Sequence, residues 1–156
     1  MELILWRHAE AEDPRHGMSD LKRRLTPKGE KQARLVGAWL KHHLPADTRV
    51  LVSPALRCQQ TALPADLPYA TDERIGTAAT ASDLLAAAGW PDAASEAGAV
   101  LLVGHQPTLG EVASLLLFGA ESDLMVKKGA AWWISSKNKA GDEQIFLRAV
   151  MGPELL

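Results

Sequence analysis

The 156-residue chain has a single cysteine, Cys58. One cysteine excludes an internal disulfide and a cysteine-built zinc site. Long apolar runs are missing too, since no segment approaches the roughly 18 apolar residues that span a membrane. The apolar start is only a few residues long and Arg7 follows it, which is unlike a secretory signal peptide. These absences predict a cytoplasmic protein with no membrane partner.

An excess of charge of one sign is also absent. The formal net charge is -2, with 17 basic and 19 acidic residues mixed along the chain. Binding of nucleic acid or of an acidic membrane surface would need clustered Lys and Arg, so we expect neither partner. Hydrophobic residues make up 47% of the chain, enough for a packed core. We therefore expect one domain over residues 1–156.

Potential metal ligands lack a convincing spacing. Glu10 and His8 could form a pair of ligands, but no third or fourth ligand lies at a suitable distance in the sequence. The sequence therefore predicts no metal and no other cofactor.

Three short apolar runs are each followed by polar side chains. Residues 3–6, 50–52 and 100–103 have the length and composition of buried strands. The polar residues that follow them are, in chain order, Arg7 and His8, Ser53 and Arg57, and Gly104 and His105.

Helix patterns separate these runs. We expect helices over residues 28–43, 54–63, 81–88 and 107–118. Thr26 is the expected N-cap of the first helix, with Pro27 at its first position, and Ser53 is expected to cap the second. Residues 11–24, 69–80 and 92–98 are expected to be irregular.

The order of the elements predicts an α/β fold. Strands separated by helices imply a mostly parallel sheet covered on both faces, which is a three-layer α/β/α architecture. Residues 130–135 and 144–150 are expected to add an antiparallel hairpin at one edge, joined by a polar turn over residues 137–142.

In such a sheet the carboxyl ends of parallel strands lie along one rim. Arg7, His8, Arg57 and His105 would converge there. Each one alone is compatible with a structural role, as an ion-paired arginine or a packed histidine. Together they form a cationic group with no matching acidic motif, and the planar arginine fork suits a phosphate. The sequence therefore favours an anion site.

Four segments carry a family resemblance. Arg-His-Ala at residues 7–9 resembles the Arg-His-Gly motif of the histidine phosphatase superfamily, which includes phosphoglycerate mutase. Residues 25–33, 53–62 and 103–107 resemble that family's Leu-Thr-x-x-Gly-x-x-Gln-Ala, Ser-x-x-x-Arg-x-x-Gln-Thr-Ala and Gly-His-Asn-Pro segments, in the family's order. Ala9 departs from the customary glycine, and we expect a slightly tighter site from its methyl group.

The short chain, with no room for an inserted cap domain, resembles the SixA phosphohistidine phosphatase branch. Residues 20–26 are similar to an Asp-x-x-Arg-Pro-Leu-Thr segment of that branch. The resemblance implies a phosphoglycerate mutase-like fold without a cap and a metal-independent phosphatase.

The resemblance also implies a role for each residue. His8 would be the nucleophile that forms a covalent phosphohistidine, while Arg7 and Arg57 bind the phosphoryl oxygens and His105 donates a further hydrogen bond. The neighbouring cations should lower the pKa of His8 and keep it neutral.

Two further charged residues are candidates with an open alternative. Arg23 could reach the phosphate from its loop, and Glu73 could be the general acid that protonates the leaving group. Each is also compatible with a solvated surface charge.

Phosphohistidine on a protein is the favoured substrate, because small SixA-like members often lack a general acid and a phosphoramidate needs little protonation help. The second hypothesis is a phosphatase of a small phosphorylated metabolite, and the third is a non-catalytic module that binds phosphate or a phosphoprotein. Substrate specificity would lie in residues 11–24 and 69–80, which carry no motif.

Overall fold

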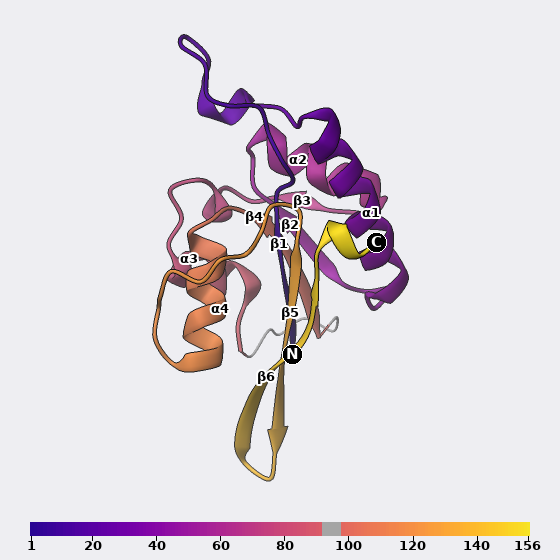
Figure 1. Cartoon of the computed structure of the whole chain (residues 1–156). Helices are drawn as coiled ribbons and strands as arrows, with labels where there is room; N and C mark the ends of the chain where they lie inside the picture. The colour runs from indigo at the N-terminus through magenta and orange to yellow at the C-terminus, as the bar shows by residue number, and fades with distance from the viewer. Residues whose placement is uncertain (92–97) are drawn as a thin grey trace.

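The computed structural model describes residues 1–91 and 98–156, and its centre is a six-stranded sheet with the order β3-β2-β4-β1-β5-β6 (Figure 1). The strands are β1 (Glu2–Arg7), β2 (Arg49–Val52), β3 (Ala70–Thr71), β4 (Ala99–Gly104), β5 (Ala131–Lys139) and β6 (Asp142–Met151). The connector expected over residues 92–98 lies outside the described residues, apart from Gly98.

The sheet is parallel through β3, β2, β4 and β1, and β5 and β6 are antiparallel to their neighbours. The predicted mostly parallel sheet with an antiparallel hairpin at its edge is therefore confirmed. Its register places Arg7 beside Gly104 and Val52 beside Val103. The polar residues after β1, β2 and β4 consequently emerge at one rim.

The helices cover both faces of the sheet. They are α1 (Pro27–His43), α2 (Leu56–Ala62), α3 (Ala81–Ala88) and α4 (Thr108–Phe118). Side chains of α1 and α2 pack on one face, where β1 contributes Ile4 and Trp6. Side chains of α3 and α4 pack on the other face, where β1 contributes Leu3 and Leu5. β1 is thus buried on both sides, and the three-layer architecture is confirmed (Figure 1).

The start of α1 fixes the path of the chain after β1. Thr26 caps the helix as predicted, accepting from the Gly29 backbone N–H at 3.0 Å, and its own N–H donates to the Glu10 carbonyl. A Cβ atom at position 29 would collide with that same Glu10 carbonyl oxygen. Glycine is required there because the helix and the end of β1 approach so closely.

The turn of the β5–β6 hairpin is shorter than predicted. Only Ala140 and Gly141 separate the strands, and both have positive φ. A two-residue turn of this kind matches the twist of the strands. The polar residues 137–142 reflect the solvent exposure of a hairpin that extends beyond the body of the molecule, and not an irregular backbone (Figure 1).

Two short helical turns lie in segments that were expected to be irregular. They are η1 (Asp20–Lys22) and η3 (Glu73–Ile75). Within residues 1–91 and 98–156, every helix is too short or too polar to span a bilayer.

Candidate active site

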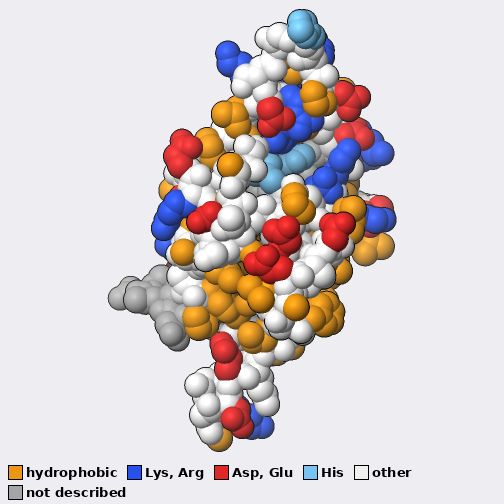
Figure 2. All heavy atoms as spheres, turned by 90° about the vertical axis from the view of Figure 1, so that its left-hand side faces the viewer, with side chains coloured by type: hydrophobic (Ala, Val, Ile, Leu, Met, Phe, Trp, Pro, Cys, Tyr) orange, Lys and Arg blue, Asp and Glu red, His pale blue; other side chains and the backbone are white. Residues whose placement is uncertain are grey.

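The four residues predicted to converge at the rim of the sheet do so. They line one pocket of about 270 Å³, which we call the histidine pocket. Its full lining is Arg7, His8, Ala11, Asp13, Asp20, Arg23, Arg57, Thr77, His105, Gln106 and Lys128. On the face shown in Figure 2, histidine side chains lie beside basic ones at the surface.

His8 follows β1 directly and is 7% exposed. Burial is the main cause that lowers the pKa of His8 to about 3, and the charges of Arg57 and Arg7 lower it further. The ring is therefore neutral near pH 7. Its Nδ1 lies 2.8 Å from the carbonyl oxygen of Ala9, which can only accept, so Nδ1 carries the proton. Nε2 is then the nitrogen with the lone pair.

His105 faces His8 across the pocket. The ring centroids are 5.5 Å apart and the ring planes are inclined by 57°. Burial, and then the Arg57 charge, lower the pKa of His105 to about 4. Arg57 Nη2 lies 3.4 Å from Nδ1 and Ser53 Oγ lies 2.7 Å from Nε2. Because a guanidinium only donates, Nδ1 accepts and Nε2–H donates to Ser53.

The prediction that Ser53 caps the following helix was wrong. The N-cap of α2 is Ala55, and Ser53 is completely buried with its hydroxyl against His105. Sequence reasoning missed this contact. The signal that could have found it is the placement of Ser53 and His105 directly after two neighbouring parallel strands, β2 and β4.

Arg57 is 4% exposed and bound to Asp20. Its Nη1 donates to the Asp20 carbonyl at 2.9 Å and its Nη2 pairs with the Asp20 carboxylate at 3.1 Å. Arg23, which also lines the pocket, pairs with the same carboxylate at 3.0 Å. Burial by itself would raise the pKa of Asp20, but Arg57 and Arg23 outweigh it and hold the pKa below its usual value. Asp20 is a second residue that sequence reasoning missed.

Arg7 is held by the loop before β5. Its Nη1 donates to the Val126 carbonyl at 2.9 Å and approaches the Met125 sulfur at 3.8 Å. The Nε atoms of both Arg7 and Arg57 are buried without an acceptor within the described part of the chain. A buried N–H without a partner is costly, and a phosphate oxygen is a strong acceptor for it.

Glu73 is not brought together with these residues. It is exposed on η3 and lines a neighbouring hollow with Arg74 and Asp83, outside the histidine pocket. The carboxylates that do line the histidine pocket are Asp13 and Asp20.

The methyl group of Ala9 does not narrow the pocket. It packs among Leu25 and Ala33, and Ala9 has a negative φ, which any residue adopts. The Ala9 N–H donates to the Thr61 hydroxyl at 3.0 Å, and Thr61 in turn donates to the Arg57 carbonyl at 2.7 Å. This chain of hydrogen bonds fixes the backbone after His8 against α2.

Cys58 is buried on α2, and burial raises the pKa of its thiol to about 12. It is therefore a packing residue and not a thiolate nucleophile. Among residues 1–91 and 98–156, no group of three or more His, Cys, Asp or Glu side chains is arranged to hold a metal ion.

Residues 3–76 match the sequence profile described as the histidine phosphatase superfamily (branch 1). The chain is 46% identical over 66 residues, 39% of each protein, to a phosphohistidine phosphatase SixA homolog of Haemophilus influenzae. It is 35% identical over 124 residues to an uncharacterised protein of Mycobacterium tuberculosis, covering 77% of this chain and 75% of that protein.

The structure is similar to that of the protein histidine phosphatase SixA complexed with tungstate. The TM-score is 0.78, with 26% identity and 99% of each chain covered. The two folds match over nearly the whole length of both chains, with no inserted cap domain, and the family profile matches the N-terminal part, residues 3–76. The chain belongs to branch 1 of the histidine phosphatase superfamily and is a phosphohydrolase.

Proposed function

We propose that this phosphatase removes the phosphoryl group from phosphohistidine on a protein, through a covalent phosphohistidine intermediate on His8. The neutral His8 ring carries this proposal, because the Ala9 carbonyl fixes its proton on Nδ1 and leaves Nε2 as a nucleophile. Nucleophilic catalysis by histidine requires this form of the ring.

The transfer exchanges one P–N bond for another. His8 Nε2 forms a bond to phosphorus while the bond from phosphorus to the substrate imidazole breaks. The other ring nitrogen of the substrate takes up a proton from solvent beforehand, so the substrate histidine leaves as a neutral imidazole. Water then attacks phosphorus, the P–Nε2 bond breaks, and inorganic phosphate and neutral His8 result, with one proton passing to solvent.

Arg7, Arg57 and His105 would stabilise the phosphoryl group during both steps. Phosphoryl transfer depends mainly on positioning and electrostatic stabilisation of the oxygens. In this proposal the phosphoryl group takes over the Arg57 contact made by the Asp20 carboxylate, while Arg23 remains close enough to contribute. The negative phosphoryl charge also favours a protonated His105, which then donates a hydrogen bond.

The pairing of Asp20 with two arginines supports a phosphoramidate substrate. A general acid must be protonated near neutral pH, whereas Arg57 and Arg23 lower the pKa of Asp20 and keep it ionised. Glu73 lies outside the pocket, and its role as the general acid stays a prediction. An alkyl phosphate needs a proton for its alkoxide leaving group, but a protonated phosphohistidine does not.

The comparisons support the same substrate class. One relative is described as a phosphohistidine phosphatase SixA homolog, and the SixA structure was solved with tungstate, an oxyanion that resembles phosphate.

A substrate panel tests the proposal. We expect the highest kcat/KM on a phosphohistidine protein and on phosphoramidate, with much lower values on sugar phosphates and nucleotides. The highest kcat/KM on a sugar phosphate or nucleotide would instead identify a metabolite phosphatase. Binding of phosphate without turnover of any compound would indicate a non-catalytic module.

A further inference from the structure

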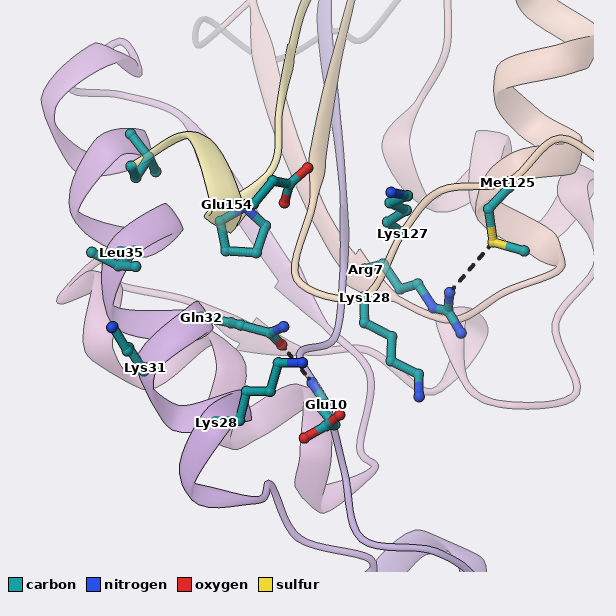
Figure 3. A pocket seen from close by; sticks show the side chains of 12 residues that line it. Arg7, Glu10, Lys28, Lys31, Gln32, Leu35, Met125, Lys127, Lys128 and Glu154 are labelled. Atoms are coloured by element: carbon teal, nitrogen blue, oxygen red, sulfur yellow. Dashed lines mark hydrogen bonds between the residues drawn. The ribbon is translucent and has the colours of Figure 1, made fainter.

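A second and larger hollow of about 970 Å³ opens beside the histidine pocket (Figure 3). It lies between α1, residues 125–128 and the short helix η4 (Pro153–Leu155), and we call it the lysine hollow. Arg7 and Lys128 line both spaces. The lysine hollow therefore adjoins the position that the proposed function gives to the phosphohistidine.

The charged side chains of the lysine hollow are mainly cationic. Five are basic and two are acidic, namely Arg7, Lys28, Lys31, Lys127 and Lys128 against Glu10 and Glu154. Lys28 and Lys31 come from α1, and their spacing puts them on one face of that helix. Lys127 and Lys128 come from the opposite wall (Figure 3).

These lysines form no ion pair in the part of the chain that the structure describes. Across residues 1–91 and 98–156, none of the four ammonium groups lies within ion-pair distance of a carboxylate. The Glu10 carboxylate accepts a hydrogen bond from the Thr26 hydroxyl at 2.7 Å. Several like charges around a hollow attract a partner of opposite sign and raise its local concentration.

The nature of the walls favours a polypeptide over a small molecule. Sites for small molecules hold them with a few fixed polar groups in an enclosed cavity. Here the four lysines are exposed on flexible stems, and they recognise charge and not a fixed geometry. Leu35, Met125 and Pro153 add apolar surface to the same hollow. This combination suits an acidic segment with occasional apolar side chains.

We propose that the lysine hollow binds an acidic segment of the phosphorylated protein, next to the phosphohistidine held in the histidine pocket. This inference rests on the proposed function, and it adds a substrate class: phosphohistidine proteins with carboxylates close to the modified histidine.

Two synthetic phosphohistidine peptides test the inference, one with glutamates on both sides of the phosphohistidine and one with glutamines instead. The test variant is K28Q/K31Q, and Lys128 is left intact because it also lines the histidine pocket. The matched control is K137Q/K139Q, which removes two exposed lysines from the β5–β6 hairpin. Phosphoramidate is the substrate that needs no docking.

At low salt, K28Q/K31Q should raise KM for the glutamate peptide about 5- to 10-fold and leave kcat within about twofold, because two charge contacts are lost outside the reacting centre. KM for the glutamine peptide and for phosphoramidate should not change. The increase should shrink as salt is added, since the charges are exposed. K137Q/K139Q should behave like the unaltered protein.

The inference is overturned if KM for the glutamate peptide is the same in K28Q/K31Q and the unaltered protein while both hydrolyse it; the proposed function then stands. It is also overturned if K28Q/K31Q raises KM for a small bisphosphate but not for the glutamate peptide. If the unaltered protein hydrolyses neither peptide nor phosphoramidate, the proposed function fails and the inference fails with it.

Discussion

The buried hydroxyl of Ser53 accepts a hydrogen bond from Nε2 of His105 at 2.7 Å, and this contact orients Nδ1 of His105 toward Arg57. We predict that S53A lowers kcat on phosphoramidate about tenfold, because a buried N–H loses its acceptor and the ring loses its orientation. KM should change less than kcat. S114A, which removes another buried serine hydroxyl from α4, should leave kcat unchanged. Equal kcat in both variants would contradict a positioning role for Ser53.

The Asp20 carboxylate forms an ion pair with Arg57, so it should compete with phosphate for binding to this guanidinium. We predict that D20N lowers the inhibition constant of inorganic phosphate about 3- to 10-fold, because one negative charge leaves the histidine pocket. D72N, which removes a carboxylate paired with Arg74 outside that pocket, is the control. Weaker phosphate inhibition in D20N would mean that Asp20 mainly holds Arg57 in place.

The free energy of unfolding should already fall between pH 7 and pH 5, which is above the pH range in which carboxylates titrate. The pKa values of His8 and His105 are about 3 and about 4 in the folded protein, below the ordinary value of 6.5. At a pH between the folded and the unfolded pKa values, the two histidines bind more protons in the unfolded chain than in the folded protein. The stabilisation that is fully present above pH 6.5 is therefore lost as the pH falls toward 4. We predict a loss of about 2 kcal/mol or more in the free energy of unfolding from pH 7 to pH 5.

Urea titrations at each pH measure this loss. H8Q should reduce the dependence on pH by roughly half, because one of the two buried rings is gone. H16Q, which replaces an exposed histidine, should leave the dependence unchanged. A free energy of unfolding that is constant from pH 7 to pH 5 would contradict the burial of two neutral rings.

Gly29 lies where α1 begins against the end of β1. We predict that G29A lowers the free energy of unfolding by about 1 to 3 kcal/mol, because the new methyl group collides with the Glu10 carbonyl oxygen. Urea denaturation measures the difference, with R34A on the exposed surface of the same helix as control. A G29A protein as stable as R34A would show that the helix can shift without cost.

The order of the main strands and helices follows from the sequence because β1 and β4 are short, continuous apolar runs and the helices between them are amphipathic. The convergence of Arg7, His8, Arg57 and His105 follows from the same pattern, since parallel strands end at one rim. The spacing of apolar residues along the chain was sufficient to predict these features. The structure brings the four residues into one pocket.

The contacts that orient the site could not be read from the sequence. The hydrogen bond from His105 to Ser53 and the pairing of Arg57 with Asp20 join residues far apart in the chain, and they depend on side-chain directions that periodicity does not specify. For the same reason the sequence did not predict that Glu73 lies outside the histidine pocket. Glu73 lies in the short helix η3, and its position in the sequence does not predict the direction of its side chain.

Phosphate trapped on His8 is the most direct test of the central claim. The protein is mixed briefly with radiolabelled phosphoramidate, denatured in alkali, and mapped by mass spectrometry. We expect an acid-labile, base-stable phosphate on His8 that is absent from H8A, with turnover unaffected by a chelator. Turnover that persists in H8A, or a phosphate carried by another residue, would contradict the account.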